Sequence, residues 1–184
     1  MPKLLDIAHF GNPVLREVAR HLTAEEIKST EIQDLIADIR YTNKMKPFGV
    51  GLAAPQVGVS VALSVIGIKP TPNRPNLEPF DSVIINPSYE GVGQTEGMWE
   101  ACQSGGSGEG GGLYAQAERY KTIRAQWYDS DAVWHDEELS GFVAHVFQHE
   151  ADHVNGVLFV DKVSDTKTYM TYDEYRERIA GAKK

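Results

Sequence analysis

The spacing of apolar and polar positions predicts helices near the start of the chain. Thr23 opens a Thr-Ala-Glu-Glu sequence, which is the pattern of a capping box, and apolar residues follow at roughly helical spacing. This predicts a helix that ends before Pro47. Ahead of it, Asn12-Pro13 and the following VLREVAR predict a short helix with proline in its first turn.

A second helical pattern runs over 136–155. Its apolar positions mark one face of a helix, and they are Leu139, Phe142, Val143, Val146 and Phe147. The Asn-Gly pair at 155–156 is typical of a C-terminal stop.

The segments between these helices read as strands. Residues 61–68 and 82–86 are rich in β-branched side chains, and 121–129 alternates between apolar and polar positions. No regular alternation of strand and helix is visible. The pattern therefore predicts the α+β class, with small mixed or antiparallel sheets around the late helix, which would be central.

Length and composition narrow the class of protein. The 184 residues suit a single domain over 1–184, in which we expect a core of 1–163 and a C-terminal extension of 164–184 containing a helix. No apolar run is long enough for a membrane span, and the first residues lack the features of a secretory signal. The single cysteine, Cys102, fits a reducing compartment, so we expect a cytoplasmic protein of bacterial type.

Charge argues against nucleic acid as a specific partner. The formal net charge is −8, whereas binding to phosphates needs clustered Lys and Arg. The chain ends in the basic sequence YRERIAGAKK, for which a transient ribosome contact and an ordinary solvated helix end are the two interpretations.

The glycine-rich segment 103–114 contains a G-x-G-x-x-G match at 106–111. A phosphate-binding loop needs a strand before it and a helix N-terminus after it. Nothing helical follows these glycines before the next strand, so we interpret the segment as a flexible loop.

The strongest chemical signal is the sequence HEADH at 149–153. Residues four apart share one face of a helix, so the imidazoles of His149 and His153 can reach one metal ion. Glu150 is rotated away from His149 and can act on a bound water as general base. The alternative is a pair of core histidines bonded to the backbone, although three adjacent polar groups on a buried face need strong partners.

Geometry narrows the choice of a third ligand. His145 to His153 spans about 12 Å of helix, too far for one ion to bind both with His149, so His145 is interpreted as structural. Glu174 falls in a sequence that reads as a solvated helix end. Cys102 remains, and a thiolate with two imidazoles leaves a fourth position open for water.

Three segments in order resemble the peptide deformylases, which remove the formyl group from the initiator methionine of nascent bacterial proteins. They are GVGLAAPQ at 49–56, EACQS at 100–104 and QHEADH at 148–153. The resemblance extends from PVLREVA near the start to LFVDKV near residue 163. It implies a metal-dependent hydrolase acting on N-formylmethionyl peptides.

Carried over by position, the resemblance implies roles for ten residues. It implies that one divalent ion is bound by Cys102, His149 and His153, with Glu150 as the general base that acts on metal-activated water. The side chain of Gln56 and the backbone N–H of Gln103 would stabilise the oxyanion. The residues implied at the substrate are Val50, Gly51, Phe142 and Val146.

The family's usual metal is Fe²⁺, with Zn²⁺, Ni²⁺ or Co²⁺ as possible occupants, and the ligand types alone fit zinc as well.

This chain departs from the family pattern at Ala101 and Gln103, which replace a glycine and an apolar residue, and in the glycine-rich segment, which is longer than usual. Two alternatives stay open on the sequence: a deformylase-like protein that binds metal or formyl-peptides with little turnover, and a zinc endopeptidase that does not need Cys102.

Overall fold

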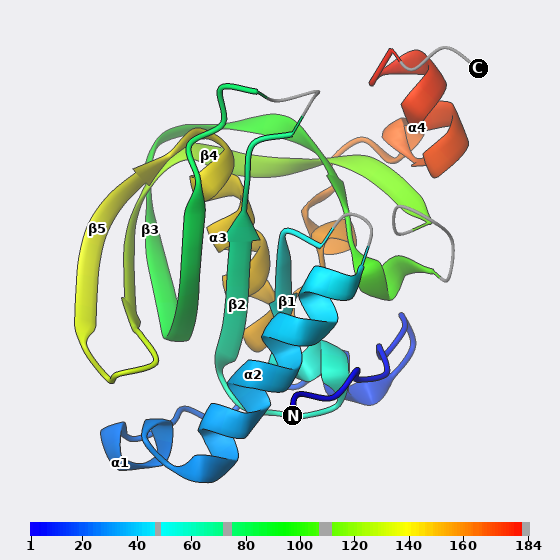
Figure 1. The fold of residues 1–184 in the computed structure, drawn as a ribbon. Helices are drawn as coiled ribbons and strands as arrows, with labels where there is room; N and C mark the ends of the chain where they lie inside the picture. The colour runs from blue at the N-terminus through cyan, green and yellow to red at the C-terminus, as the bar shows by residue number, and fades with distance from the viewer. Residues whose placement is uncertain (47–48, 72–74, 107–111, 182–184) are drawn as a thin grey trace.

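The computed structural model describes residues 1–46, 49–71, 75–106 and 112–181. Its strands join in one antiparallel sheet of order β1-β2-β3-β4-β5, with β6 paired to another part of β4 (Figure 1). The strands are β1 (Gly51–Ala53), β2 (Leu63–Ile68), β3 (Phe80–Ala101), β4 (Leu113–Tyr128), β5 (Trp134–Ser140) and β6 (Met170–Thr171). This confirms the predicted α+β class.

The long pair β3–β4 gives the sheet its curvature. Its register shifts between Ile85 and Ser88 and again between Val92 and Thr95. Such bulges bend a strand and increase its twist. In Figure 1 the resulting curved sheet wraps around the helix α3 (Gly141–Val154), which lies in its concavity.

The N-terminal helical prediction is correct in position but wrong in continuity. Two helices, α1 (Ala24–Ile27) and α2 (Thr30–Met45), replace the single one expected. Thr23 does form the predicted capping box with Glu26. The chain then breaks at Ser29, whose side chain accepts a hydrogen bond from the N–H of Ile32 and caps α2. The short predicted helix after Asn12 is a 3₁₀ helix, η1 (Pro13–Arg16).

The predicted start of the late helix near Asp136 is wrong. Residues 134–140 form β5, which pairs with 122–128 of β4. Arg124 of β4 is 2.7 Å from Asp136, so cross-strand contacts hold this segment in the sheet. The helix begins only after a sharp turn at Gly141, where φ is +61°.

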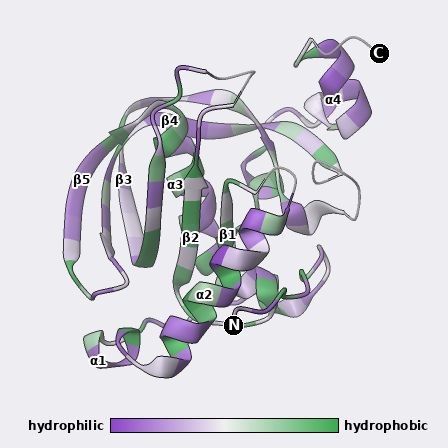
Figure 2. Ribbon diagram, viewed as in Figure 1, coloured by the Kyte–Doolittle hydropathy of each residue, from purple (hydrophilic) through white to green (hydrophobic). Residues whose placement is uncertain are grey.

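Two large apolar clusters flank the central strands. One packs α2 against β1 and β2, and the other packs α3 against β2 and β4. Figure 2 shows apolar colour on β2 and on parts of α3, with mostly polar colour on β5 and on α4 (Tyr172–Arg178). The helix α4 lies within 164–184, and the division into a core and an extension stays a prediction.

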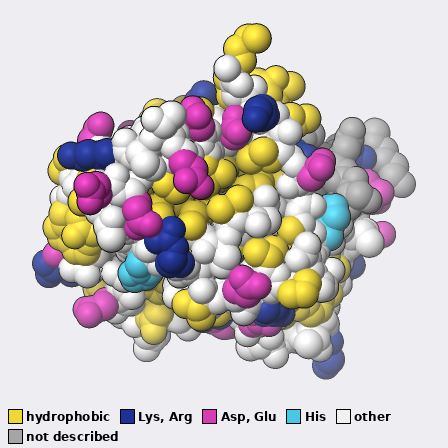
Figure 3. Space-filling view, turned by 90° about the horizontal axis from the view of Figure 1, so that it is seen from below, with side chains coloured by type: hydrophobic (Ala, Val, Ile, Leu, Met, Phe, Trp, Pro, Cys, Tyr) yellow, Lys and Arg dark blue, Asp and Glu magenta, His cyan; other side chains and the backbone are white. Residues whose placement is uncertain are grey.

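Within the described ranges, no helix combines the length and apolar character needed to cross a bilayer. The face drawn in Figure 3 has acidic and basic side chains interspersed. Residues 107–111 of the predicted glycine loop lie outside the described residues, and its beginning forms the 3₁₀ helix η3 (Gln103–Gly105).

Candidate metal centre and active site

Three ligand atoms of the kind that binds transition metals converge between α3 and the end of β3. The ligand atoms of Cys102, His149 and His153 all lie within 4.8 Å of one another. Nε2 of His153 is 3.2 Å from Sγ of Cys102 and 3.2 Å from Nε2 of His149. The helix supplies both imidazoles from one face, and Cys102, the first residue after β3, supplies the thiol.

This donor set fits a divalent transition metal. Cys102 and His153 are buried, and His149 is largely so. The two Nε2 atoms are close enough either to share one proton in a hydrogen bond or to bind one cation together. Burial lowers the pKa of His153, and the neighbouring His149 lowers it further. Two imidazoles and a thiolate form a three-ligand site that leaves a coordination position open, as metal-dependent catalysis requires.

Glu100 orients the first of these histidines. Its Oε1 lies 3.1 Å from Nδ1 of His149, so Nε2 of that ring is the nitrogen left for a metal. His145, one turn earlier on α3, places its Nε2 3.2 Å from the same oxygen. The interpretation of His145 as structural therefore agrees with its position. Burial disfavours the Glu100 carboxylate, but the charge of His149 and hydrogen bonds from both histidines hold its pKa well below the usual range.

Arg119 completes a buried network that ties three elements together. It donates to Glu100 of β3 at 2.9 Å and to Asp152 of α3 at 2.5 Å, and its own side chain is 1% exposed. No pattern in the sequence predicted a role for Glu100, Arg119 or Asp152. Glu100 could have been noticed, because it is two residues before Cys102 and two such residues share a face wherever the chain is extended.

Glu150 is placed as a base requires. It is 2% exposed, and its Oε2 is buried without a hydrogen-bond partner among the described residues. Burial raises its pKa to about 7, so the group exchanges a proton close to neutral pH. Gly51 explains how the carboxylate fits, since a Cβ at that position would lie 2.2 Å from Oε1 of Glu150.

Gln56 lies beside the thiol. It belongs to the 3₁₀ helix η2 (Ala54–Val57), which directly follows β1. Its Oε1 accepts a hydrogen bond from the N–H of Ala53, and its Nε2 donates to Sγ of Cys102 at 3.3 Å and to Oγ of Ser104 at 3.2 Å. The amide N–H₂ is thereby fixed toward the donor cluster. Gln103 follows Cys102 directly in η3 (Gln103–Gly105), and its Oε1 is buried without a hydrogen bond from the described residues.

Comparison with known protein families identifies the family that has this arrangement. The family model described as "Polypeptide deformylase" matches residues 4–169. The chain belongs to this family. It is accordingly a hydrolase that removes the N-formyl group from nascent polypeptides, a family activity that depends on a metal ion, and the Cys-His-His cluster is a possible site for that ion.

Curated deformylases are similar along most of their length. The peptide deformylase of Leptospira biflexa is 37% identical over 171 residues, which cover 89% of each chain. Peptide deformylase 2 of a Nostoc species is 37% identical over 183 residues, covering 97% of this chain and 96% of that one.

Solved structures agree with the fold. A class I type b peptide deformylase from Acinetobacter baumannii, bound to Met-Ala-Ser, has a TM-score of 0.79 at 28% identity and covers 89% of this chain and 100% of that one. The peptide deformylase of Thermotoga maritima has a TM-score of 0.72 at 33% identity, with 89% and 99% covered.

The residues expected at the methionine side chain differ in their exposure to solvent. Val50, just before β1, is 36% exposed, whereas Val146 of α3 is 5% exposed and packs in the apolar cluster between that helix and the sheet. Phe142 is half-buried against that cluster. A separate cavity of about 600 Å³, lined in part by Trp134 and Asp152, includes none of these residues and none of the three ligands.

Proposed function

We propose that this deformylase acts through the centre formed by Cys102, His149 and His153, with Glu150 as its general base. The observation that supports it is the convergence of those three donor atoms within 4.8 Å, beside a carboxylate with an unpartnered, buried oxygen. Structural histidines alone would not require a thiol from another element at the same point.

In the proposed reaction, Glu150 takes a proton from water as the water oxygen forms a bond to the formyl carbon. The C–N bond then breaks, and Glu150 returns the proton to the leaving nitrogen, which gives formate and a free N-terminal amine. A pKa of about 7 suits a group that must both accept and release a proton near neutrality. The oxyanion of the tetrahedral state would be met by Nε2–H of Gln56 and the backbone N–H of Gln103.

Cys102, His149 and His153 would hold the metal ion. A divalent ion there supplies Lewis acidity, which polarises the carbonyl and makes water a better nucleophile at neutral pH. We propose Fe²⁺ as the native ion, with Zn²⁺, Ni²⁺ and Co²⁺ as alternatives, because one thiolate and two imidazoles suit all four. Glu100 would keep His149 in the tautomer that presents Nε2.

The substrate peptide would lie along β1. Among the described strands β1 pairs with β2 alone, so its other edge is available to an extended peptide. Val50 and Gly51 would meet that peptide, and Gly51 also lies directly against Glu150. Phe142 and Val146 are proposed for the methionine side chain. The similar A. baumannii enzyme is known with Met-Ala-Ser bound, which supports a peptide of this kind.

We further propose that the reaction takes place in the cytoplasm, where nascent chains emerge. A transient contact with the ribosome through the basic chain end stays a prediction. The helix α4 has the sequence YDEYRER, which mixes both signs of charge and forms no basic cluster by itself.

The decisive experiment pairs metal analysis of protein purified without oxygen with formate release from formyl-Met-Ala-Ser. Near-stoichiometric metal with rapid formate release is expected. A Cys102→Ala variant should lose the metal, whereas an endopeptidase-type site built on the histidines alone would retain it. Bound metal without formate release would instead favour a formyl-peptide-binding role, which the departures at Ala101 and Gln103 make worth testing.

A further inference from the structure

The C-terminal segment runs along the free edge of β4, on the side away from β3. It is antiparallel to the first residues of β4 and contacts them at four successive points. In the chain order of the C-terminal segment, these pairs are Ser164 with Glu118, Thr168 with Gln116, Met170 with Tyr114, and Thr171 with Leu113. Of this segment only Met170–Thr171 is a strand, β6, and the 3₁₀ helix η6 (Thr166–Thr168) precedes it, so side-chain hydrogen bonds and a short ladder together hold the segment against β4.

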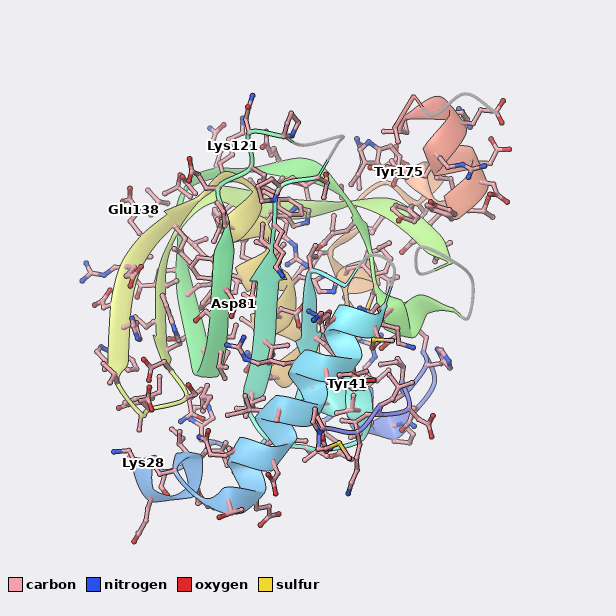
Figure 4. The ribbon with its side chains drawn as sticks, in the orientation of Figure 1. Lys28, Tyr41, Asp81, Lys121, Glu138 and Tyr175 are labelled. Carbon is pink, nitrogen blue, oxygen red and sulfur yellow. The ribbon has the colours of Figure 1, made fainter. Side chains whose placement is uncertain are left out.

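An aromatic cluster then fixes α4 on this part of the sheet. Tyr175 stacks on Tyr114 with ring centroids 4.2 Å apart and planes 15° apart. Trp99 and Tyr172 complete the cluster, at 5.7 Å from Tyr175 and 6.0 Å from Tyr114. Figure 4 shows Tyr175 on α4 at the end of the β3–β4 pair. Aromatic pairs of this geometry contribute beyond their buried area.

This cluster lies against the strand end that carries the metal ligand. Tyr114 is paired in the ladder with Ala101, the residue just before Cys102. Because side chains alternate along a strand, Trp99 and Tyr114 face outward toward α4, while Glu100 faces inward toward α3. The strand end is therefore held by the buried network on one face and by the tyrosines on the other.

The same C-terminal region also surrounds the thiol. Cys102 belongs to a small apolar cluster with Ala115 and Phe159, against which Val163 and Tyr169 pack. By contrast, the sequence that connects Cys102 to β4 is rich in glycine and offers few side chains for packing. Glycine also loses more backbone entropy on ordering than any other residue.

We propose that Tyr175, supported by Tyr172, is a positioning residue for the metal centre. Its stack on Tyr114 holds the paired Ala101, and with it Cys102, at the place where the thiol meets the two histidines. The family match ends at residue 169, so Tyr172 and Tyr175 lie outside the matched segment, whereas Tyr114 and Ala101 lie within it. The inference rests on the proposed ligand set.

The test uses Co²⁺ as a spectroscopic probe in the full-length protein. Tyr175→Ala is compared with Tyr175→Phe, which keeps the stack, and with Tyr41→Ala, which removes an exposed tyrosine from α2. Tyr175→Ala should bind Co²⁺ roughly tenfold more weakly in competition with a chelator, by analogy with groups that orient metal ligands. Its thiolate-to-cobalt absorption should weaken, and kcat for formate release should fall more than KM rises. Both comparison variants should stay within about twofold of the parent protein.

Unchanged affinity and absorption in folded Tyr175→Ala would overturn the proposal. Where that variant does not fold, Tyr175→Leu takes its place, because it keeps apolar volume but not the stack, and full Co²⁺ affinity there would overturn the proposal equally. A parent protein that binds Co²⁺ without thiolate absorption would instead show that Cys102 is not a ligand. Failure of the ligand set and failure of the positioning role are thus separable.

Discussion

The carboxylate of Glu150 has room for its position because residue 51 has no side chain. A Cβ on Gly51 would lie 2.2 Å from Oε1 and 2.6 Å from Cδ of Glu150, so the carboxylate would have to move. We expect Gly51→Ala to lower kcat by about 10²-fold, the scale of loss from a misplacement of about 1 Å. Formate release at saturating peptide measures the effect.

Gly67→Ala is the matched control for that change. Gly67 lies in the neighbouring strand β2, and an added Cβ there would meet its nearest atom, Nδ2 of Asn43, at an ordinary 3.8 Å. Equal activities of the two variants would show that close packing at Gly51 has no bearing on the base.

The charge of Glu150 matters for catalysis but not for holding the metal. Its carboxylate is not among the three clustered ligand atoms. Glu150→Gln is therefore expected to lose about 10²–10⁴-fold in kcat, the usual contribution of a general base, while metal content stays that of the parent protein. Glu138→Gln, a change at an exposed glutamate of β5 (Figure 4), should alter neither. Retained turnover in Glu150→Gln would exclude it as the base.

For single residues, the sequence could predict the parts of the site whose members are close together along the chain. His149, Glu150 and His153 lie within one turn of helix, so their joint position follows from helical geometry. Arg119 could not be assigned in the same way. Its partners Glu100 and Asp152 come from two other elements, and no local pattern shows that a long-range ladder places an arginine between them.

At the scale of elements, the β4–β5 hairpin has a titratable contact. His135 stacks on Trp127 at 4.9 Å, and its ring nitrogens lie 3.0 Å from Asp129 and 3.3 Å from Glu137. The hydrogen bond to Asp129 raises the pKa of His135, with a smaller contribution from Glu137. The charged imidazole thus stabilises the folded hairpin.

The sign of the pH effect follows from that shift. A histidine whose pKa is raised on folding contributes stability that is fully present below its unfolded pKa of about 6.5 and is lost as the pH rises through the folded value. The loss of unfolding free energy in His135→Gln should therefore be larger at pH 5.5 than at pH 8.5. Because the contact is partly solvated, we expect a difference of at most about 1 kcal/mol, measured by denaturant unfolding.

His9→Gln, at an exposed histidine, serves as the comparison variant. A penalty for His135→Gln that is the same at both pH values would mean that only the stack on Trp127 matters.

This hairpin also shows why the helix boundary was mispredicted. Leu139 fits the apolar spacing of α3, but it also fits the buried face of β5, and pairing with β4 decides between them.

For the whole molecule, the fold class could be predicted from periodicity, but the extent of the sheet could not. Segments 82–86 and 121–129 were recognisable as strands, yet they are only parts of a 22-residue and a 16-residue strand. The remainder, such as 91–97, is mostly exposed and has no marked apolar period. This part of β3 is a strand because it pairs with β4, and its own sequence does not indicate a strand.

The buried network of Arg119 joins the parts of the molecule that carry the site. It links β3, β4 and α3 through Glu100 and Asp152, whose side chains are 4% and 8% exposed. Removal of the guanidinium would leave two buried carboxylates without their cation. Arg119→Met is therefore expected to lose roughly 3–5 kcal/mol of unfolding free energy. Since Glu100 also orients His149, metal affinity should fall in the same variant.

Arg124→Met separates burial from the loss of an ion pair. Arg124 lies five residues further along β4 and pairs with Asp136, but its side chain is 63% exposed. Water solvates both partners there, so the change should cost no more than about 1 kcal/mol and should leave metal affinity unaltered. Urea unfolding and chelator competition on both variants measure the two effects. Equal losses of stability would mean that the buried network is no more important to the fold than a solvated pair. Lost stability with full metal affinity would mean instead that Glu100 holds His149 without help from Arg119.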